Sequence, residues 1–557
     1  MNPEEQQENN ERVKRRVLIL KQMLEEGTFK IQRGSQIAES LAKARYDANG
    51  EPDLVTIDGV IRSAALLAEH MKHRSDVKNE ISLHEIQAKY FEILEANFGP
   101  FYQRMIDDNV NPEIVARTIA YGDREITIFD NSLNTLLEIL IEFWNILAEP
   151  AFYHLEDDLD SIKAVFGGDM FPSYAENIAS KCGIYTDTII LPCPFIRCRF
   201  LFERWNKQER VYYLIKHVLN VLQYKDLALA DLDAPIVAVL PDKEMIDDDD
   251  FKYINEIAGK DSLYHAQKLF GREFSSLDDL FEFASSLNTV DKVVSEIKDG
   301  SKVLFDVDME GTLKEQIESQ IDGMSARLLG VKNPGVIVAS TGMGRMATAN
   351  ELLIKAHRLR GIPLIDAPTS WEYFKWKLQY DSERKYKGED VTDLHIVKGL
   401  NHLSETDFKW IGKIPPEGLI ELRKSGAINE IRSILSQEIN DLAIENEHDF
   451  KSTSHKVFNN INRAFAEHEK SIKELQAKKW KIAGRDLGSF LVKGTIEFTA
   501  ACIGQPLWGV GALAFDQVSD APKLKDLPKT VKKIKEINEE KSDIKKSPVG
   551  LMFKYKN

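Results

Sequence analysis

The first third of the chain has the hydrophobic spacing of amphipathic helices. Over Thr56–Met71, apolar residues recur every three or four positions and form one broad stripe, as on a helix with a buried face. The segment Asn131–Ala148 is more apolar still, but Glu138 and Glu142 interrupt it, and it is too short and too charged to span a bilayer. We therefore predict a helical N-terminal domain over residues 1–175.

The pattern changes between residues 180 and 385, where short runs rich in Ile and Val alternate with helical stretches. Pro, Gly or Asp residues border these runs. Such alternation is typical of βαβ units and predicts a mostly parallel sheet flanked by helices. The predicted strands are Ile184–Leu191, Pro235–Leu240, Lys302–Val307, Gly335–Ser340 and Ile362–Ile365.

Helical spacing returns in the C-terminal part, where we predict a helical domain over residues 395–515. Two periodic segments are separated by the polar stretch 445–454, which favours either two helices packed as a hairpin or one long helix with a polar centre. The chain is thus expected to be an α-rich α/β protein. Its helical N-terminal region and helical C-terminal region enclose a central α/β domain over residues 180–385.

The segment Phe498–Phe515 contains no charged residue, and Gln505-Pro506 divides it. It is consistent with a buried helical hairpin, with an element that lies on or inserts into a membrane, or with a bilayer span. A basic tail follows over residues 521–557; from Lys523 onward it holds 11 Lys against 5 acidic residues. We expect this region to contact a protein partner or an anionic membrane, and its helices offer a surface for oligomerisation.

Composition narrows the range of functions. The formal net charge of −16 disfavours binding of nucleic acid, which needs clustered Lys and Arg to neutralise phosphates. Four cysteines in 557 residues disfavour a disulfide framework, and the polar residues 1–16 lack a signal-peptide core. We expect a cytoplasmic protein, peripheral at a membrane if the apolar C-terminal segment is used there.

One glycine-containing stretch suggests a ligand site. A predicted strand runs into Gly342-x-Gly344, a predicted helix follows, and a second strand ends at Asp366. This order resembles a dinucleotide-binding βαβ unit, which implies a pyrophosphate near Gly342, Gly344 and Arg345 and a ribose hydroxyl near Asp366. The alternative is a strand-to-helix turn that needs small residues. Walker A chemistry is disfavoured because Arg345 and Met346, rather than Lys and Ser or Thr, follow Gly344.

An acidic stretch suggests metal chemistry. A predicted strand ends in Asp306-x-Asp308, and Gly311-Thr312 follows closely, which resembles the motif of the haloacid-dehalogenase phosphatases. The resemblance implies a nucleophilic Asp306 and an acid/base Asp308, but two inserted residues displace Thr312. The alternatives are an acidic loop before a helix and a magnesium site shared by Asp306, Asp308 and Asp366 at strand ends.

Three functions follow from these features. The sequence best fits a regulatory or sensing protein with a nucleotide or phosphate site in the α/β domain, since no catalytic motif in it is complete. The first alternative is a magnesium-dependent enzyme that acts on a nucleotide or phosphate ester. The second is a membrane-active effector that uses the apolar C-terminal segment.

Overall fold

The computed structural model describes residues 3–482, except 33, 123–124, 175–176, 244–247, 324–325, 328–329, 384–391, 402–413 and 446–449. Contacts between Cα atoms divide the chain into two compact units. The first unit contains Met1–Ile86 and Leu147–Asp157, and the second contains Gln87–Ile146 and the chain from Asp158 onward. Each unit is described by itself.

The first unit is helical. It contains α1 (Pro3–Glu25), α2 (Gln36–Leu41), α3 (Gly59–Glu80) and the last part of α6 (Glu125–Asp157). Helices α1 and α3 pack through a small apolar core that includes Leu20 and Ile61, both fully buried. Arg74 of α3 joins the end of α6 through Glu156 at 2.9 Å and Asp157 at 2.7 Å. These partly exposed pairs align the two helices and add little to stability.

The second unit is built around a four-stranded parallel sheet. Its strands are β1 (Lys163–Gly167), β2 (Thr188–Pro192), β3 (Val237–Leu240) and β4 (Gly361–Ile365), in the order β3-β2-β1-β4. Ala164 of β1 lies opposite Ile189 on one side and Ile362 on the other. The sheet confirms the predicted α-rich α/β class. Strands buried on both faces read as continuous apolar runs, as β1, β2 and β3 do.

Three of the five predicted strands are confirmed, as β2, β3 and β4, and two predictions are wrong. Instead of a strand at 302–307 there is a short 3-10 turn, η2 (Gly300–Lys302), and then a loop. Instead of a strand at 335–340 there is the start of α17 (Pro334–Arg358), whose N-cap Asn333 accepts a hydrogen bond from Val336 N at 3.1 Å. A buried helix and a buried strand are both continuously apolar, so the short run was ambiguous.

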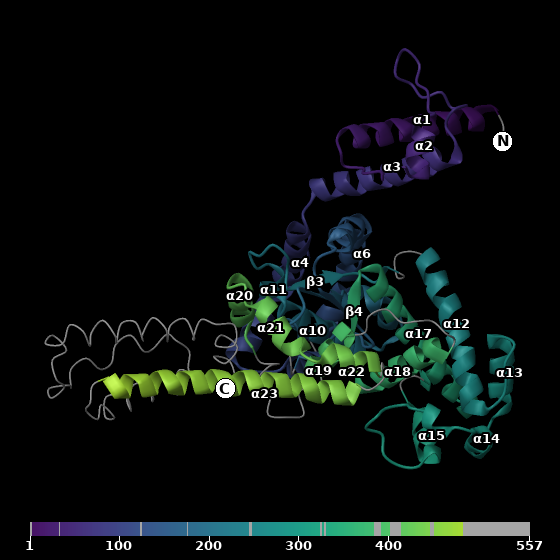
Figure 1. The fold of residues 1–557 in the computed structure, drawn as a ribbon. Helices are drawn as coiled ribbons and strands as arrows, with labels where there is room; N and C mark the ends of the chain where they lie inside the picture. The colour runs from purple at the N-terminus through teal and green to yellow at the C-terminus, as the bar shows by residue number, and fades with distance from the viewer. Residues whose placement is uncertain are drawn as a thin grey trace. The chain divides into compact units, whose positions relative to one another are not determined.

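The remaining helices of this unit connect and cover the strands. Helix α17 packs on β1 and β4, α19 packs on β4, and α11 packs on β3. Figure 1 labels α11 beside β3. These helices are α4 (Leu83–Asp107), α5 (Pro112–Ala120), most of α6, α7 (Ile178–Cys182), α8 (Pro194–Arg197), α9 (Arg199–Arg204), α10 (Lys207–Leu222), α11 (Lys225–Ala228), α12 (Asp248–Phe270), α13 (Leu277–Ser286), α14 (Val290–Glu296), α15 (Leu313–Ile321), α18 (Pro368–Glu383) and α19 (Thr392–Asn401).

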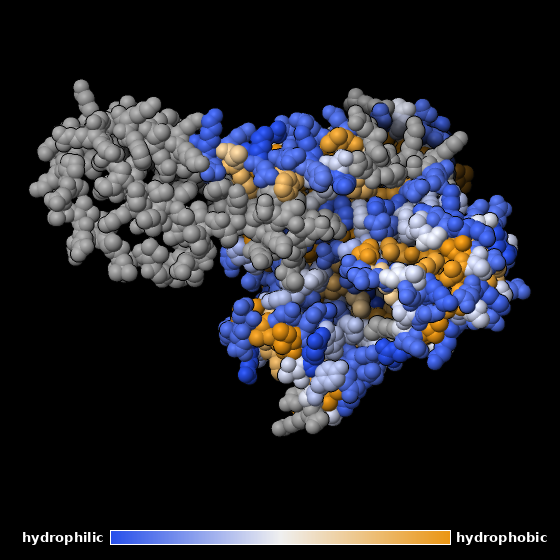
Figure 2. Space-filling view, turned by 90° about the horizontal axis from the view of Figure 1, so that it is seen from below, coloured by the Kyte–Doolittle hydropathy of each residue, from blue (hydrophilic) through white to orange (hydrophobic). Residues whose placement is uncertain are grey.

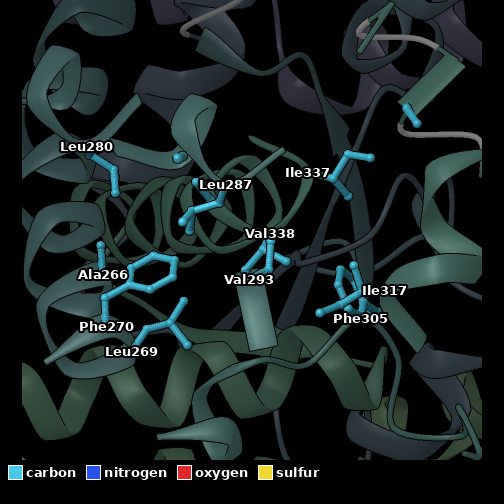
Figure 3. Packing of buried hydrophobic residues seen from close by; sticks show 13 residues of the cluster. Ala266, Leu269, Phe270, Leu280, Leu287, Val293, Phe305, Ile317, Ile337 and Val338 are labelled. Carbon is cyan, nitrogen blue, oxygen red and sulfur yellow. The ribbon is translucent and has the colours of Figure 1, made fainter. Parts of the chain in front are cut away.

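A second apolar core lies beside the sheet. Helices α12, α13, α14, α15 and the start of α17 enclose it, and Figure 3 shows Phe270, Leu287 and Val338 among its members. Val338 and Ile337 belong to the stretch predicted as a strand. They are buried here because the start of α17 packs against the helices that form this core, including α13, α14 and α15. This packing accounts for the apolar run that the sequence presents at that place.

The last described helices are α20 (Pro416–Lys424), α21 (Ile428–Ser436), α22 (Ile439–Glu445) and α23 (Phe450–Ile482). Helices α21 and α22 both pack on α23, which agrees with separate helices rather than one long helix. Residues 498–515 and the tail 521–557 lie outside the described residues, so the predictions made for them stay predictions. Within the described residues, no helix has the length and apolar content needed to cross a membrane.

Hydrophobic positions interrupt a mainly hydrophilic surface on the face drawn in Figure 2. The most exposed large hydrophobic side chains in the described parts of the chain are Val55, Tyr121, Ile146 and Leu159. They come from four separate segments. Single exposed hydrophobic residues are ordinary on protein surfaces and do not by themselves mark a binding site.

Candidate functional site

The sheet has a topological switch point between β1 and β4. From β1 the chain proceeds to β2 and β3 on one side, and β4 then joins the opposite side of β1. Open parallel sheets bind ligands where the strand order reverses in this way, outside the carboxyl ends of the strands. Here the residues that follow the two strands are Gly168-Asp169 after β1 and Asp366 after β4. We call the segments that follow the four strands (residues 168–172, 193–197, 241–243 and 366–370) the carboxyl edge.

Gly168 allows the loops after β1 and β4 to touch. Its φ is +83°, in the left-handed region that favours glycine. A Cβ at Gly168 would lie 3.0 Å from both Ile365 Cγ2 and Ser370 Cβ, so the backbone passes unusually close to its neighbours. The Ser370 hydroxyl donates a hydrogen bond to the Gly168 carbonyl at 2.5 Å. A larger residue at position 168 would push the two loops apart.

Two of the predicted ligand-binding residues, Arg345 and Asp366, belong to this edge. The Arg345 guanidinium donates to Ser370 Oγ at 2.9 Å, although Arg345 lies in the middle of α17. Asp366 directly follows β4 and precedes α18. The structure therefore places both residues near the carboxyl ends of β1 and β4.

The predicted phosphatase-like aspartates meet the carboxyl edge only in part. Asp306 accepts a hydrogen bond from Thr369 Oγ1 at 3.2 Å, at the start of α18. Asp308 is exposed in the loop, and its backbone N–H donates to Asp306 Oδ1 at 3.2 Å. Among the described residues, no group of three His, Cys, Asp or Glu side chains is arranged to hold a metal ion. The metal role of Asp306 and Asp308 stays a prediction.

The predicted strand–turn–helix at Gly342 and Gly344 is wrong, because both glycines lie inside α17. Their backbone N–H groups are therefore in a helix interior rather than at a helix start. Gly342 serves packing: a Cβ there would lie 3.1 Å from His265 Cδ2 on α12, whereas a Cβ at Gly344 would meet nothing within 4 Å. Gly342 thus lets α17 and α12 approach closely, and a binding role for either glycine stays a prediction without its expected geometry.

Asp169 has an unusual electrostatic setting. The surrounding protein removes part of its hydration, which raises the pKa of its carboxyl, and the negative charge of Asp366 raises this pKa further. The Met170 N–H donates to Asp169 Oδ1 at 2.6 Å and works in the opposite direction. The side chain still reaches solvent. A carboxylate that lies beside a second negative charge forms a place where a cation or a hydrogen-bond donor is stabilised.

A buried ion network holds the carboxyl edge together. Arg197 of α8 donates to both carboxylate oxygens of Asp242, which follows β3, at 2.6 and 3.0 Å. Lys355 of α17 donates to Asp242 at 2.6 Å, and Arg197 also reaches Glu351 at 3.3 Å and the backbone carbonyl of Asp169 at 2.6 Å. Burial alone would raise the pKa of Asp242, but its two cationic partners outweigh burial and hold that pKa well below its usual range.

Helix α19 adds two buried polar side chains behind β4. The Asn401 amide donates to the Ile365 carbonyl at 2.8 Å, while its Oδ1 is buried and has no hydrogen-bond partner in the described part of the chain. The Lys398 ammonium lies 3.8 Å from the centre of the Trp371 ring. Burial lowers the pKa of Lys398 to about 6, with help from nearby lysines and against the charges of Glu372 and Asp366. Both side chains come from one face of α19, three residues apart.

Several residues of the carboxyl edge were not identified from the sequence. Strand β1 lies within residues 1–175, a range predicted to be helical, so Gly168 and Asp169 were missed with it. A signal was present: Ala164-Val-Phe166 is an apolar run that ends in Gly-Gly-Asp, the pattern of a strand followed by a tight turn. No local pattern marks Arg197 or Asn401, which reach the edge only through the tertiary fold.

The first unit contains a separate pocket of about 580 Å³ between α2 and α3. Its lining is mainly apolar and includes Phe29, Ile37 and Leu67. The one carboxylate in the lining, Asp58, is the N-cap of α3 and accepts a hydrogen bond from Ile61 N at 2.9 Å, which lowers its pKa. Because that carboxylate is already used, the pocket offers no charged group for catalysis or for polar recognition.

Comparisons of the chain with models of protein families, with curated proteins and with solved structures found no match.

Proposed function

We propose that the α/β unit binds a phosphate-bearing small molecule, such as a nucleotide, at the carboxyl edge between β1 and β4, and that the protein acts as a regulatory or sensing protein. The observation that carries this proposal is the switch point itself. The loops after β1 and β4 meet there through Gly168 and Ser370, and Arg345 reaches the same place. Ligands of open α/β sheets collect at this position.

Arg345 is the residue best suited to contact a phosphate. Its guanidinium has five N–H donors, and the bond to Ser370 uses only one. Arginine recognises phosphate through paired N–H groups, and such charge-assisted bonds are the stronger ones. Thr369 and Ser370 lie in the first turn of α18, whose N-terminal end carries partial positive charge.

Thermal-shift measurements on the full chain test this proposal. The ligands are ATP, ADP, NAD and inorganic pyrophosphate at millimolar concentration, each with and without MgCl₂. A ligand at 100 times its dissociation constant should stabilise the folded chain by about 2.7 kcal/mol. The variant Arg345→Ala should lose the ligand-induced shift, because loss of a charged hydrogen bond weakens binding by about ten-fold or more.

The matched control is Arg358→Ala. Arg358 ends the same helix, about 20 Å from Arg345 along the axis of α17. This control should keep the shift of the wild-type chain. Absence of a shift with every ligand, or equal shifts in both variants, would contradict the proposal. Analysis of the nucleotide after incubation separates the two functional classes, because a sensing protein returns the nucleotide unchanged and an enzyme does not.

A further inference from the structure

Asp169 and Asp366 follow adjacent parallel strands, and they are near enough for the charge of Asp366 to act on Asp169. Gly167 pairs with Ile365 in the ladder between β1 and β4, and each aspartate follows its strand within two residues. Among the described residues, no ion pair joins either carboxylate directly, and the Met170 N–H donates to Asp169. Lys216 and Arg197 lie close enough to lower the pKa of Asp169, and Lys398 lies near Asp366, but the two carboxylates also repel each other. Two carboxylates at one place without a direct ion pair favour a bound cation.

A third oxygen at this place, Asn401 Oδ1, has no hydrogen-bond donor among the described residues. Asn401 is 2% exposed, and its amide nitrogen is fixed on the Ile365 carbonyl, directly before Asp366. Its Oδ1 shares one carbon with that nitrogen, so it lies beside the same end of β4, where it is buried and has no donor among the described residues. A buried oxygen without a partner costs about 1–3 kcal/mol, and a bound ligand or ion at the site would remove that penalty.

We infer that Asp169, Asp366 and Asn401 hold a magnesium ion that enters together with the phosphates of the ligand. Magnesium binds oxygen ligands, keeps several waters, and is usually held by one or two carboxylates plus substrate phosphates. Two carboxylates and one amide oxygen on the protein match that requirement. The ligand class is therefore a magnesium-complexed diphosphate or triphosphate, with Arg345 on its phosphate oxygens. This inference rests on the proposed function.

In this site Arg345 and the two aspartates have different roles in binding the ligand. Arg345 contacts the phosphates directly and is needed whether or not the metal is present. The aspartates repel a bare phosphate and attract it only through the metal ion. Metal and phosphate ligand must then each strengthen the binding of the other by the same factor.

Isothermal titration calorimetry of the full chain with ADP, in MgCl₂ and in EDTA, tests the inference. In the wild-type chain, magnesium should lower the dissociation constant of ADP by about ten-fold or more. In Asp169→Asn the effect of magnesium should shrink to about two-fold or less, while binding in EDTA should be unchanged or tighter, because one repelling charge is gone. Asp366→Asn should behave in the same way, and this second variant still tests the inference if Asp169→Asn does not fold.

The control variant is Asp160→Asn, which removes an exposed aspartate at the opposite, amino end of β1. It should keep the full effect of magnesium. If ADP binds but magnesium has the same effect in Asp169→Asn and Asp366→Asn as in the wild-type chain, or has no effect at all, the metal site is refuted and the phosphate site stands. If ADP binds under neither condition, the proposed function fails and the metal site fails with it.

Discussion

Gly342 of α17 faces the imidazole of His265 on α12, so closely that a Cβ at position 342 would lie 3.1 Å from His265 Cδ2. His265 is itself fixed by hydrogen bonds to the Tyr380 hydroxyl at 3.0 Å and to the Lys302 carbonyl at 3.1 Å. Because the ring is held from both sides, it cannot easily move away from a larger residue. The glycine is thus required by helix packing, and the sequence pattern that resembled a phosphate-binding turn has a different physical origin.

The two glycines of α17 should respond oppositely to substitution. Gly344→Ala should raise the stability of the folded chain by about 0.5–1 kcal/mol, since alanine is the better helix former and nothing lies within 4 Å of the new Cβ. Gly342→Leu should lower stability by about 1–3 kcal/mol through overpacking against His265. Urea denaturation followed by circular dichroism measures both. Destabilisation by Gly344→Ala would restore the idea of a turn at that residue.

The ion network at the carboxyl edge should be sensitive to loss of its central carboxylate. Asp242→Asn leaves Arg197 and Lys355 without their shared partner, and breaking a buried ion pair in this way costs about 3–5 kcal/mol. Asp233→Asn, an exposed aspartate before β3, serves as the control and should have little effect. Equal stability of the two variants in urea denaturation would show that the network does not hold the edge.

Acid should weaken the same network. The pKa of Asp242 is lower in the folded chain than the ordinary value of about 3.9, so its ionised form stabilises the fold above that pH. The stabilisation is lost progressively as the pH falls below about 4. The loss of stability between pH 5 and pH 3 should therefore be smaller in Asp242→Asn than in the wild-type chain. Parallel curves for the two proteins would contradict this.

His217 should make the fold sensitive to milder acid. Burial lowers its pKa to about 3, and neither ring nitrogen has a hydrogen-bond partner within the described structure. The unfolded chain takes up a proton below about pH 6.5, while the folded chain does not. The contribution of His217 is therefore complete above that pH and falls by up to about 1.4 kcal/mol per pH unit between about 6.5 and 3.

The variant His217→Phe should be more stable than the wild-type chain at pH 7 by about 1 kcal/mol or more. It removes two unpaired polar atoms and keeps an aromatic ring between Tyr213 and Phe171. Its stability should also change less between pH 7 and pH 5. His357→Gln, which removes an exposed histidine, is the control. A loss of stability in His217→Phe would indicate that a buried water pairs with the imidazole.

The α/β class was predictable because three of the four strands are apolar runs bordered by turn residues. β2, β3 and β4 each follow that pattern, and parallel strands buried on both faces need it. The same property caused the errors. The run at 335–340 is equally apolar because it enters a core between helices. Strand β1 is only five residues long and lies inside a range predicted to be helical.

The candidate site was predictable only in part. Asp366 was identified because an acidic residue at the end of a predicted strand is informative wherever the strand itself is correctly predicted. Arg345 was predicted as a ligand-binding residue on the expectation of a strand-to-helix turn, but it lies inside α17. It reaches the carboxyl edge because α17 runs antiparallel to β4 and extends past the end of that strand. Asp169 and Asn401 come to Asp366 through strand order, which the sequence alone does not specify.

Hydrogen–deuterium exchange with mass spectrometry, on the full chain with and without ADP and MgCl₂, tests the central claim most directly, because it locates the ligand. We predict slower exchange in peptides that cover residues 166–172 and 364–371, the carboxyl ends of β1 and β4 with the loops that follow them. Peptides from α1 to α3 and from the amino ends of the same strands should be unchanged. Protection confined to any other part of the chain, or no protection at saturating ligand, would contradict a binding site at the carboxyl edge.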